Sequence, residues 1–145
     1  MRNLLLAVCG AALATSAVFA DPMEEREALM KANGAAMGSL APIVKGEKEF
    51  DATLVMDALA KLSSNAQKMD AAALWPEGSN TGKSESSPKI WEDMAGFQAK
   101  IDKFQADTAA AVAAAPADLE ALKVQFGAVA SNCGGCHEVY RLKKG

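Results

Sequence analysis

Apolar residues along most of this chain recur at intervals of three and four, the spacing of one helix face, and no stretch after residue 20 alternates as a strand does. Four such segments follow one another. The first begins at Asp21-Pro22, a capping residue followed by a proline that suits the first helical position, and it ends at Gly46. Its apolar line repeats every seven residues, at Met23, Met30, Met37 and Val44.

The other three segments carry similar stripes. The second has an apolar face made of Val55, Leu59, Leu62, Ala66 and Met69. The third opens at Ser87-Pro88 and continues as one helix through Ile90, Met94, Phe97, Ile101, Phe104, Thr108 and Ala111. The fourth begins near Pro116, and its stripe comprises Leu119, Leu122, Phe126, Val129, Cys133, Cys136 and Tyr140. Helices of this length with short joins after the first and third predict an all-α, antiparallel up-down-up-down four-helix bundle over residues 21–145.

Two places depart from this regular pattern. The join over residues 70–87 is long, and we predict that it crosses one end of the bundle, where Trp75 closes the core. The Asn33-Gly34 pair falls inside the first segment, although Asn-Gly is typical of turns. Two interpretations of this pair remain open. The glycine is tolerated within a helix at a cost of about 1 kcal/mol relative to alanine, or something bulky lies against the helix there.

Residues 1–20 differ in kind from the rest of the chain. Arg2 precedes an apolar run, and residues 18–20 form a small-x-small ending, which predicts a signal peptide removed before Asp21. We therefore expect export to the periplasm and loss of Cys9 with the leader. The formal net charge of −3 becomes −4 without Arg2, which argues against nucleic acid as a partner. No later apolar run is long enough for stable insertion into a membrane.

One short motif carries chemistry. Residues 133–137 read Cys-Gly-Gly-Cys-His, the C-x-x-C-H attachment signature of c-type haem. Two thiols on one helical turn can each add to a vinyl group of the porphyrin, and the next residue can bind the iron. A zinc site would need two more ligands, but His137 is the chain's one histidine. A thioredoxin-type pair belongs to a βαβ unit, and a structural disulfide leaves the histidine unexplained. We predict one haem c, bonded covalently to Cys133 and Cys136, with His137 as an axial ligand.

The sixth position of the iron then belongs to methionine, to another weak donor, or to nothing, because a second histidine is lacking. The candidates after the leader are Met23, Met30, Met37, Met56, Met69 and Met94. Depth in the bundle selects two of them. Met30 lies about 12 Å from Pro22 and Met94 about 9 Å from Pro88 at 1.5 Å per residue, both near the expected depth of His137. Packing alone does not separate these two.

A haem motif near the end of a four-helix chain resembles the cytochrome c′ family, the class II c-type cytochromes. The similarity spans residues 21–145 and includes residues 41–46, residues 87–91 and residues 133–141. The resemblance implies a four-helix bundle with the haem near one end and a sixth-side position that aligns with Met30. Residues 29–34 are similar to the low-spin branch, in which a methionine sulfur binds the iron. High-spin members have an apolar residue there that leaves the iron five-coordinate.

This ligand set predicts a monohaem one-electron carrier rather than an enzyme, because His137 and Met30 would keep the iron low-spin in both oxidation states. Its expected partners are other periplasmic redox proteins, met at an exposed haem edge, and the chain itself is expected to be a monomer or homodimer. The alternative is a protein that binds NO or CO, the role that the resemblance implies for high-spin relatives. A peroxidase would lack a second histidine for distal acid–base chemistry.

Overall fold

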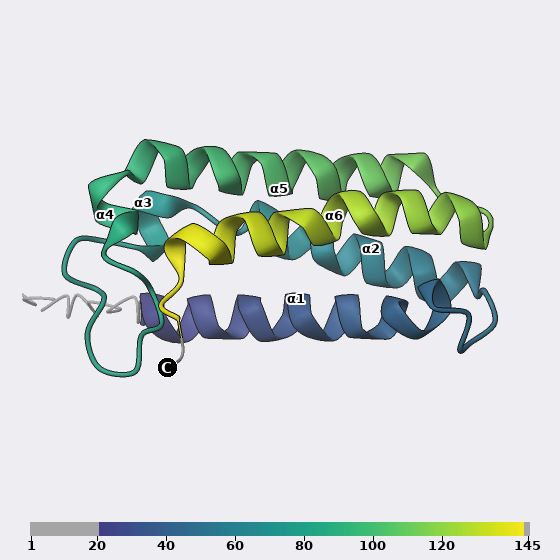
Figure 1. Cartoon of the computed structure of the whole chain (residues 1–145), viewed down its shortest axis with the longest axis horizontal. Coiled ribbons are helices and arrows are strands. Elements are labelled where there is room, and N and C mark those ends of the chain that lie inside the picture. Colours follow the sequence, from purple (N-terminus) through teal and green to yellow (C-terminus); the bar gives the residue numbers. More distant parts are fainter. Residues whose placement is uncertain (1–20, 144–145) are drawn as a thin grey trace, which may run out of the picture.

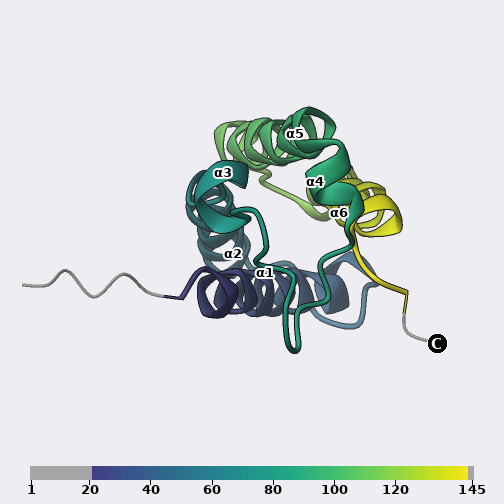
Figure 2. The same cartoon turned by 90° about the vertical axis from the view of Figure 1, so that its left-hand side faces the viewer.

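The protein forms a bundle of four long helices, as seen in a computed structural model that describes residues 21–143 (Figure 1). The long helices are α1 (Pro22–Val44), α2 (Ala52–Gln67), α5 (Met94–Ala114) and α6 (Leu119–Tyr140). Two short helices, α3 (Ala71–Leu74) and α4 (Lys89–Glu92), lie in the connection between α2 and α5. Consecutive long helices run in opposite directions, and α6 contacts both α5 and α1 (Figures 1 and 2). The predicted antiparallel bundle is confirmed.

Each long helix turns one apolar stripe toward the interior. On α1 the buried positions alternate at threes and fours: Arg26, Leu29, Asn33, Ala36, Leu40 and Ile43. The methionine line predicted from the sequence therefore flanks the buried stripe instead of forming it. Three polar side chains, Arg26, Asn33 and Thr108, are buried with the apolar core. Within residues 21–143, every helix falls short of the length and hydropathy that a membrane span requires.

Helix α1 continues through the Asn33-Gly34 pair without a turn. Its start is capped by Asp21, whose side chain accepts a hydrogen bond from the N–H of Met23. No atom lies within 4 Å of the point that a Cβ on Gly34 would occupy. The helical interpretation of the pair is therefore confirmed, and the space beside Gly34 leaves room for a bulky group against this face.

The third predicted helix is in fact two helices, because the chain breaks between α4 and α5. Asp93 adopts φ −142° and ψ 58° at the break, and its Oδ1 accepts a hydrogen bond from the N–H of Gly96. The carboxylate thus caps α5. The apolar spacing of three and four continues across the break, so the sequence pattern indicates a single helix. The last helix also begins later than expected from Pro116, because Asp118 caps it.

Tyr140, the last residue of α6, connects this helix to the break between α4 and α5. Its hydroxyl donates a hydrogen bond to Asp93 Oδ2 at 2.9 Å. Its ring meets Phe97 edge-on with centroids 5.0 Å apart, and Phe97 meets Trp75 in the same way at 4.8 Å. Burial, and after it the hydrogen bond to Asp93, raises the pKa of Tyr140 above its ordinary value of 10.0. The phenol is therefore neutral near pH 7.

We expect Tyr140→Phe to lower the free energy of unfolding by about 1 kcal/mol, the usual net value of one hydrogen bond. The ring contacts remain, and Asp93 is exposed, so no unpaired group is left buried. Because the folded-state pKa of Tyr140 lies above the unfolded value, the contribution is fully present below about pH 10 and is lost as the pH rises through the folded value. Urea unfolding of the haem-loaded protein at pH 7 and pH 11 checks this. An equal difference between variant and wild type at both pH values would contradict it.

The connection between α2 and α5 crosses the end of the bundle where α1 begins and α6 ends (Figures 1 and 2). Trp75 is 4% exposed there, and its Nε1 donates a hydrogen bond to Ser86 Oγ at 3.1 Å. The indole of Trp91 donates to the carbonyl oxygens of Trp75 and Pro76, both at 3.1 Å. The prediction that Trp75 closes the core is confirmed.

Candidate haem site

The C-x-x-C-H motif lies in the last two turns of α6, at the same end of the bundle as the crossover (Figure 1). Cys133 is exposed and Cys136 is half-buried, and the two are not joined in a disulfide. Burial raises the pKa of both thiols above their ordinary value of 9.0, while at Cys136 the charge of Lys100 acts in the opposite direction. A redox-active cysteine pair has lowered pKa values and lies at a helix start. The motif therefore differs from a thioredoxin-type site in both respects.

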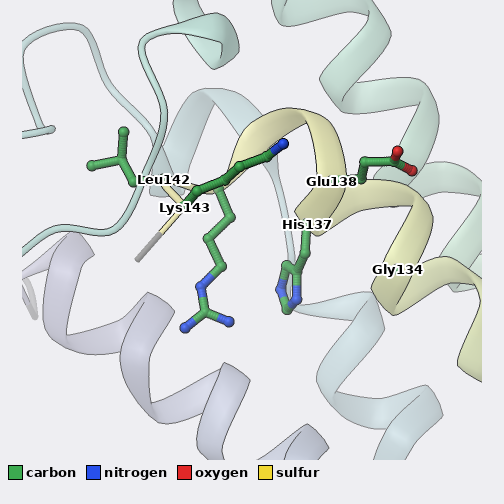
Figure 3. Close-up of a pocket in the computed structure, with 6 residues that line it drawn as sticks. Gly134, His137, Glu138, Leu142 and Lys143 are labelled. Atoms are coloured by element: carbon green, nitrogen blue, oxygen red, sulfur yellow. The ribbon is translucent and has the colours of Figure 1, made fainter. Parts of the chain in front are cut away.

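His137 projects its ring from α6 toward α1, whereas the neighbouring Glu138 points the other way (Figure 3). The ring borders a hollow of about 400 Å³ whose lining residues are Gly134, His137, Glu138, Arg141, Leu142 and Lys143. Desolvation, and after it the charge of Arg141, lowers the pKa of His137 below its ordinary value of 6.5, against a smaller effect of Glu85. The imidazole is therefore neutral at pH 7, and one ring nitrogen has a lone pair available to bind a metal.

The segment that follows α6 is held by the crossover. The N–H of Leu142 donates a hydrogen bond to the carbonyl oxygen of Glu85 at 2.8 Å, and Arg141 forms an ion pair with the Glu85 carboxylate. These contacts fix the helix end that bears His137. They were missed from the sequence because residues 56 apart in the chain give no local signal of pairing.

Ring contacts at the crossover connect α1 with α6 through one cluster of side chains. The guanidinium of Arg26, on α1, lies over the ring of Trp75, 5.6 Å from its centroid. Trp75 is linked through Phe97 to Tyr140, on α6. Arg26 and Tyr140 thus belong to one ring cluster near this end of the bundle. Because the two helices run in opposite directions, residues deeper in the bundle have higher numbers on α1 and lower numbers on α6.

Met30 and the haem motif lie at similar spacings from this ring cluster. Met30 is four residues inward from Arg26, about 6 Å at 1.5 Å per residue. His137 and Cys136 are three and four residues inward from Tyr140, about 4.5 and 6 Å. The α1 candidate and the predicted axial histidine are therefore each about one helical turn inward from the same cluster.

Met94, the other candidate, lies elsewhere. It is the first residue of α5 and lines a separate hollow together with Trp75 and Trp91. The depth estimated from the sequence counted residues from Pro88 along a helix that is interrupted at Asp93, so the estimate for Met94 is wrong. Its thioether packs at the rim of the bundle, against the crossover.

The remaining methionines are engaged in packing or lie at the helix start. Met69 is a core residue, and Met37, Met56 and Met94 pack against the core. Met23 lies in the first turn of α1. Met30 is 36% exposed and is not among the side chains packed against the core in the described chain. Met23 and Met30 are thus the two methionines of the described chain that are neither in the core nor packed against it.

The residues of this region fit a flat, largely apolar macrocycle. A Cβ added to Gly34 or Gly134 would meet no atom within 4 Å, so the backbone is open to close approach at both places. Two thiols three residues apart and a neutral imidazole supply the donor set of a c-type haem. Within residues 21–143, no three His, Cys, Asp or Glu side chains gather into a group that could hold a metal ion.

Comparison with known proteins agrees with this donor set. The sequence profile of the family described as cytochrome C′ matches residues 21–141. The chain belongs to the cytochrome c′ family. It is 39% identical over 145 residues to a cytochrome c-556 of Agrobacterium fabrum (strain C58 / ATCC 33970), which covers 99% of this chain and 97% of the relative. It is 40% identical over 125 residues to a cytochrome c-556 of Agrobacterium tumefaciens (strain II Chrys), covering 86% of this chain and 100% of the relative.

Solved structures give the same result for the fold. A cytochrome c′ from Rhodopseudomonas palustris is similar with a TM-score of 0.80 at 36% identity, over 88% of this chain and 100% of that one. The predicted family and the predicted cofactor are therefore confirmed. This member of the cytochrome c′ family is a c-type cytochrome with covalently attached haem c, and its Cys133 and Cys136 fit the attachment motif.

Proposed function

We propose that this cytochrome is a one-electron carrier, with haem c attached through Cys133 and Cys136 and the iron bound axially by His137 and Met30. The observation that supports the proposal is that Met30 and His137 each lie about one turn inward from the same ring cluster, on helices that contact one another. The poor engagement of Met30 with the core supports the same assignment. With haem bound, the thioether of Met30 would supply a soft second ligand beside the His137 imidazole.

When bound, the haem supplies a one-electron ferric/ferrous couple. His137 contributes a neutral imidazole nitrogen, and the soft thioether of Met30 favours the ferrous state and raises the reduction potential. The buried apolar residues of α1, such as Leu29 and Ala36, lower the polarity on this side of the site, and apolar surroundings disfavour the additional charge of the ferric state. Because the same two ligands serve both oxidation states, little rearrangement accompanies electron transfer.

We assign no catalytic residue in this proposal. His137 is the chain's one histidine, so no second imidazole is available to move protons. Arg26, one turn before Met30, is already engaged. Its Nη2 donates a hydrogen bond to the Ser79 carbonyl oxygen at 2.9 Å, and its Nη1 donates to Ser79 Oγ at 3.3 Å. Through these contacts Arg26 holds the crossover against α1.

Visible spectra of the purified haem-loaded protein test the carrier function. We expect low-spin spectra in both the ferric and the ferrous state, because each retains two strong axial ligands. Carbon monoxide added to the ferrous protein is expected to leave the spectrum unchanged over minutes. A high-spin ferrous spectrum that changes at once on addition of carbon monoxide would instead support the alternative, an NO- or CO-binding protein.

We further propose that residues 1–20, which lie outside the described part of the chain, are a signal peptide and that residues 21–145 act in the periplasm with other redox proteins. The family profile begins its match at residue 21, and the Agrobacterium tumefaciens relative is matched over its whole length by 125 residues. The intact mass of protein from the periplasmic fraction tests the cleavage site. A chain that retains residue 20 would contradict it, and gel filtration of the same sample distinguishes the monomer from the homodimer.

A further inference from the structure

Asn33 is a buried polar residue of α1 that the proposed electron-carrier function does not use. It is 8% exposed, and its Oδ1 is fully buried and has no hydrogen-bond partner among the described residues. The positions around it on the buried stripe of α1 are the apolar residues Leu29, Ala36 and Leu40. A buried carbonyl oxygen without a donor is unfavourable, and in native proteins such a group is usually satisfied by protein or by ordered water.

The position of Asn33 connects it to the haem site. It follows Met30 by three residues, so the two Cβ atoms are neighbours on the helix, about 5–6 Å apart. It is seven residues inward from Arg26, and Cys133 is seven residues inward from Tyr140, about 10.5 Å in each case. Asn33 and the first haem cysteine therefore lie at equal spacings inward from the ring cluster, and Asn33 precedes Gly34, whose Cβ position is open. It borders the site on the side of Met30.

The haem ring cannot satisfy Asn33 Oδ1, because the macrocycle has no N–H or O–H group to donate. The side chains near Asn33 on α1 are apolar or, as at Met30, lack a donor. A water molecule can supply the missing donor, and buried polar groups without protein partners are commonly bound by ordered water. The chemistry of the site therefore favours water as the ligand of this amide.

We propose that Asn33 Oδ1 binds an ordered water on the Met30 side of the haem, and that this amide–water pair lowers the reduction potential of the iron. Polar groups beside a haem stabilise the additional positive charge of the ferric state, whereas apolar surroundings disfavour it. Asn33 is thus a positioning residue that holds a polar group near the iron, and it offsets part of the rise in potential produced by Met30. The inference rests on the proposed function for the assignment of this side of the haem to Met30.

Replacement of Asn33 by leucine, whose side chain has the same number and branching of heavy atoms and no polar atom, tests the proposal. We expect the equilibrium constant for reduction of the haem to rise at least about threefold in Asn33→Leu. This corresponds to a rise of about 28 mV in the reduction potential, at 59 mV per tenfold change. Asn33→Thr retains an oxygen acceptor, and its potential is expected to lie nearer to that of the wild type. Leu40→Val, one heptad further along the buried stripe, is the matched control and should change the stability without changing the potential.

Two measurements decide the proposal. A crystal structure of the haem-loaded wild type should contain a water within hydrogen-bond distance of Asn33 Oδ1, and the structure of Asn33→Leu should lack it. Equal potentials in wild type and Asn33→Leu, or an Asn33 amide satisfied by protein atoms alone, would overturn the proposal. A wild-type ferric spectrum without methionine ligation would contradict the proposed function separately, because the comparison of potentials does not depend on the sixth ligand.

Discussion

Met30→Ala is expected to convert the ferrous protein from one that resists carbon monoxide to one that binds it rapidly. When Met30 is bound to the iron, the sixth position is open only in the fraction of molecules whose iron–sulfur bond is broken. The apparent affinity for an added ligand is the affinity of the open form multiplied by that fraction. If about 1% of the molecules are open, alanine raises the apparent affinity for carbon monoxide about 100-fold. Titration of ferrous wild type and variant, followed by visible absorption, measures the change.

Met37→Ala is the matched control for this experiment, because Met37 lies one heptad further along the same line of α1. Its side chain packs against the core, so the variant should lose stability by about 1–2 kcal/mol, less than a fully buried methionine would. Its spectra and its resistance to carbon monoxide should match those of the wild type. A Met30→Ala protein that still resists carbon monoxide would show that Met30 is not the sixth ligand.

Replacing both Cys133 and Cys136 by alanine is expected to abolish covalent attachment of the haem. The wild-type haem should remain with the polypeptide after denaturation, whereas the haem of the double variant should separate from it. Each single variant should keep one thioether bond and remain attached. Haem staining of a denaturing gel measures this, with Ser131→Ala, an exposed change on the preceding turn of α6, as the control. Haem that stays with the denatured double variant would contradict the assignment.

The same double variant should also be less stable than the wild type. A group that binds the folded chain and not the unfolded one stabilises the fold by mass action, and covalent attachment keeps that group at the site permanently. Thermal unfolding of both proteins, isolated with the haem they retain, is expected to give a lower midpoint for the variant. Equal midpoints would mean that the haem contributes little to holding the bundle together.

The bundle could be predicted because its signals are local and repeated. Asp21 caps the first helix as its position before Pro22 indicates, and the apolar stripe of α2 is buried in the structure. On α6 only part of the predicted stripe is buried, at Leu122, Val129 and Tyr140. The break at Asp93 could not be predicted in the same way. The carboxylate stops one helix and caps the next, while the apolar positions on both sides keep their spacing. A periodic pattern records which residues face inward and does not record whether the backbone between them is continuous.

In the haem site, too, the features with local sequence signals could be predicted and those that depend on distant contacts could not. Residues 133–137 could be assigned from the sequence because attachment chemistry needs its groups close together in the chain. The choice between Met30 and Met94 depends on contacts between distant segments, from Arg26 to Trp75 and onward to Tyr140. No local pattern reports such contacts. From the sequence, Asn33 likewise belongs to a dipeptide typical of turns. Its burial, and the lack of a partner for its Oδ1 among the described residues, are evident only from the structure.

The most direct test of the account is the near-infrared absorption of the ferric wild-type protein, measured beside Met30→Ala. A haem-methionine charge-transfer band reports a bond between the Met30 sulfur and the iron, which is the central claim. We expect the band in the wild type and in Met37→Ala, and its loss in Met30→Ala. A wild-type spectrum without the band, or a band that persists after Met30 is removed, would contradict the claim.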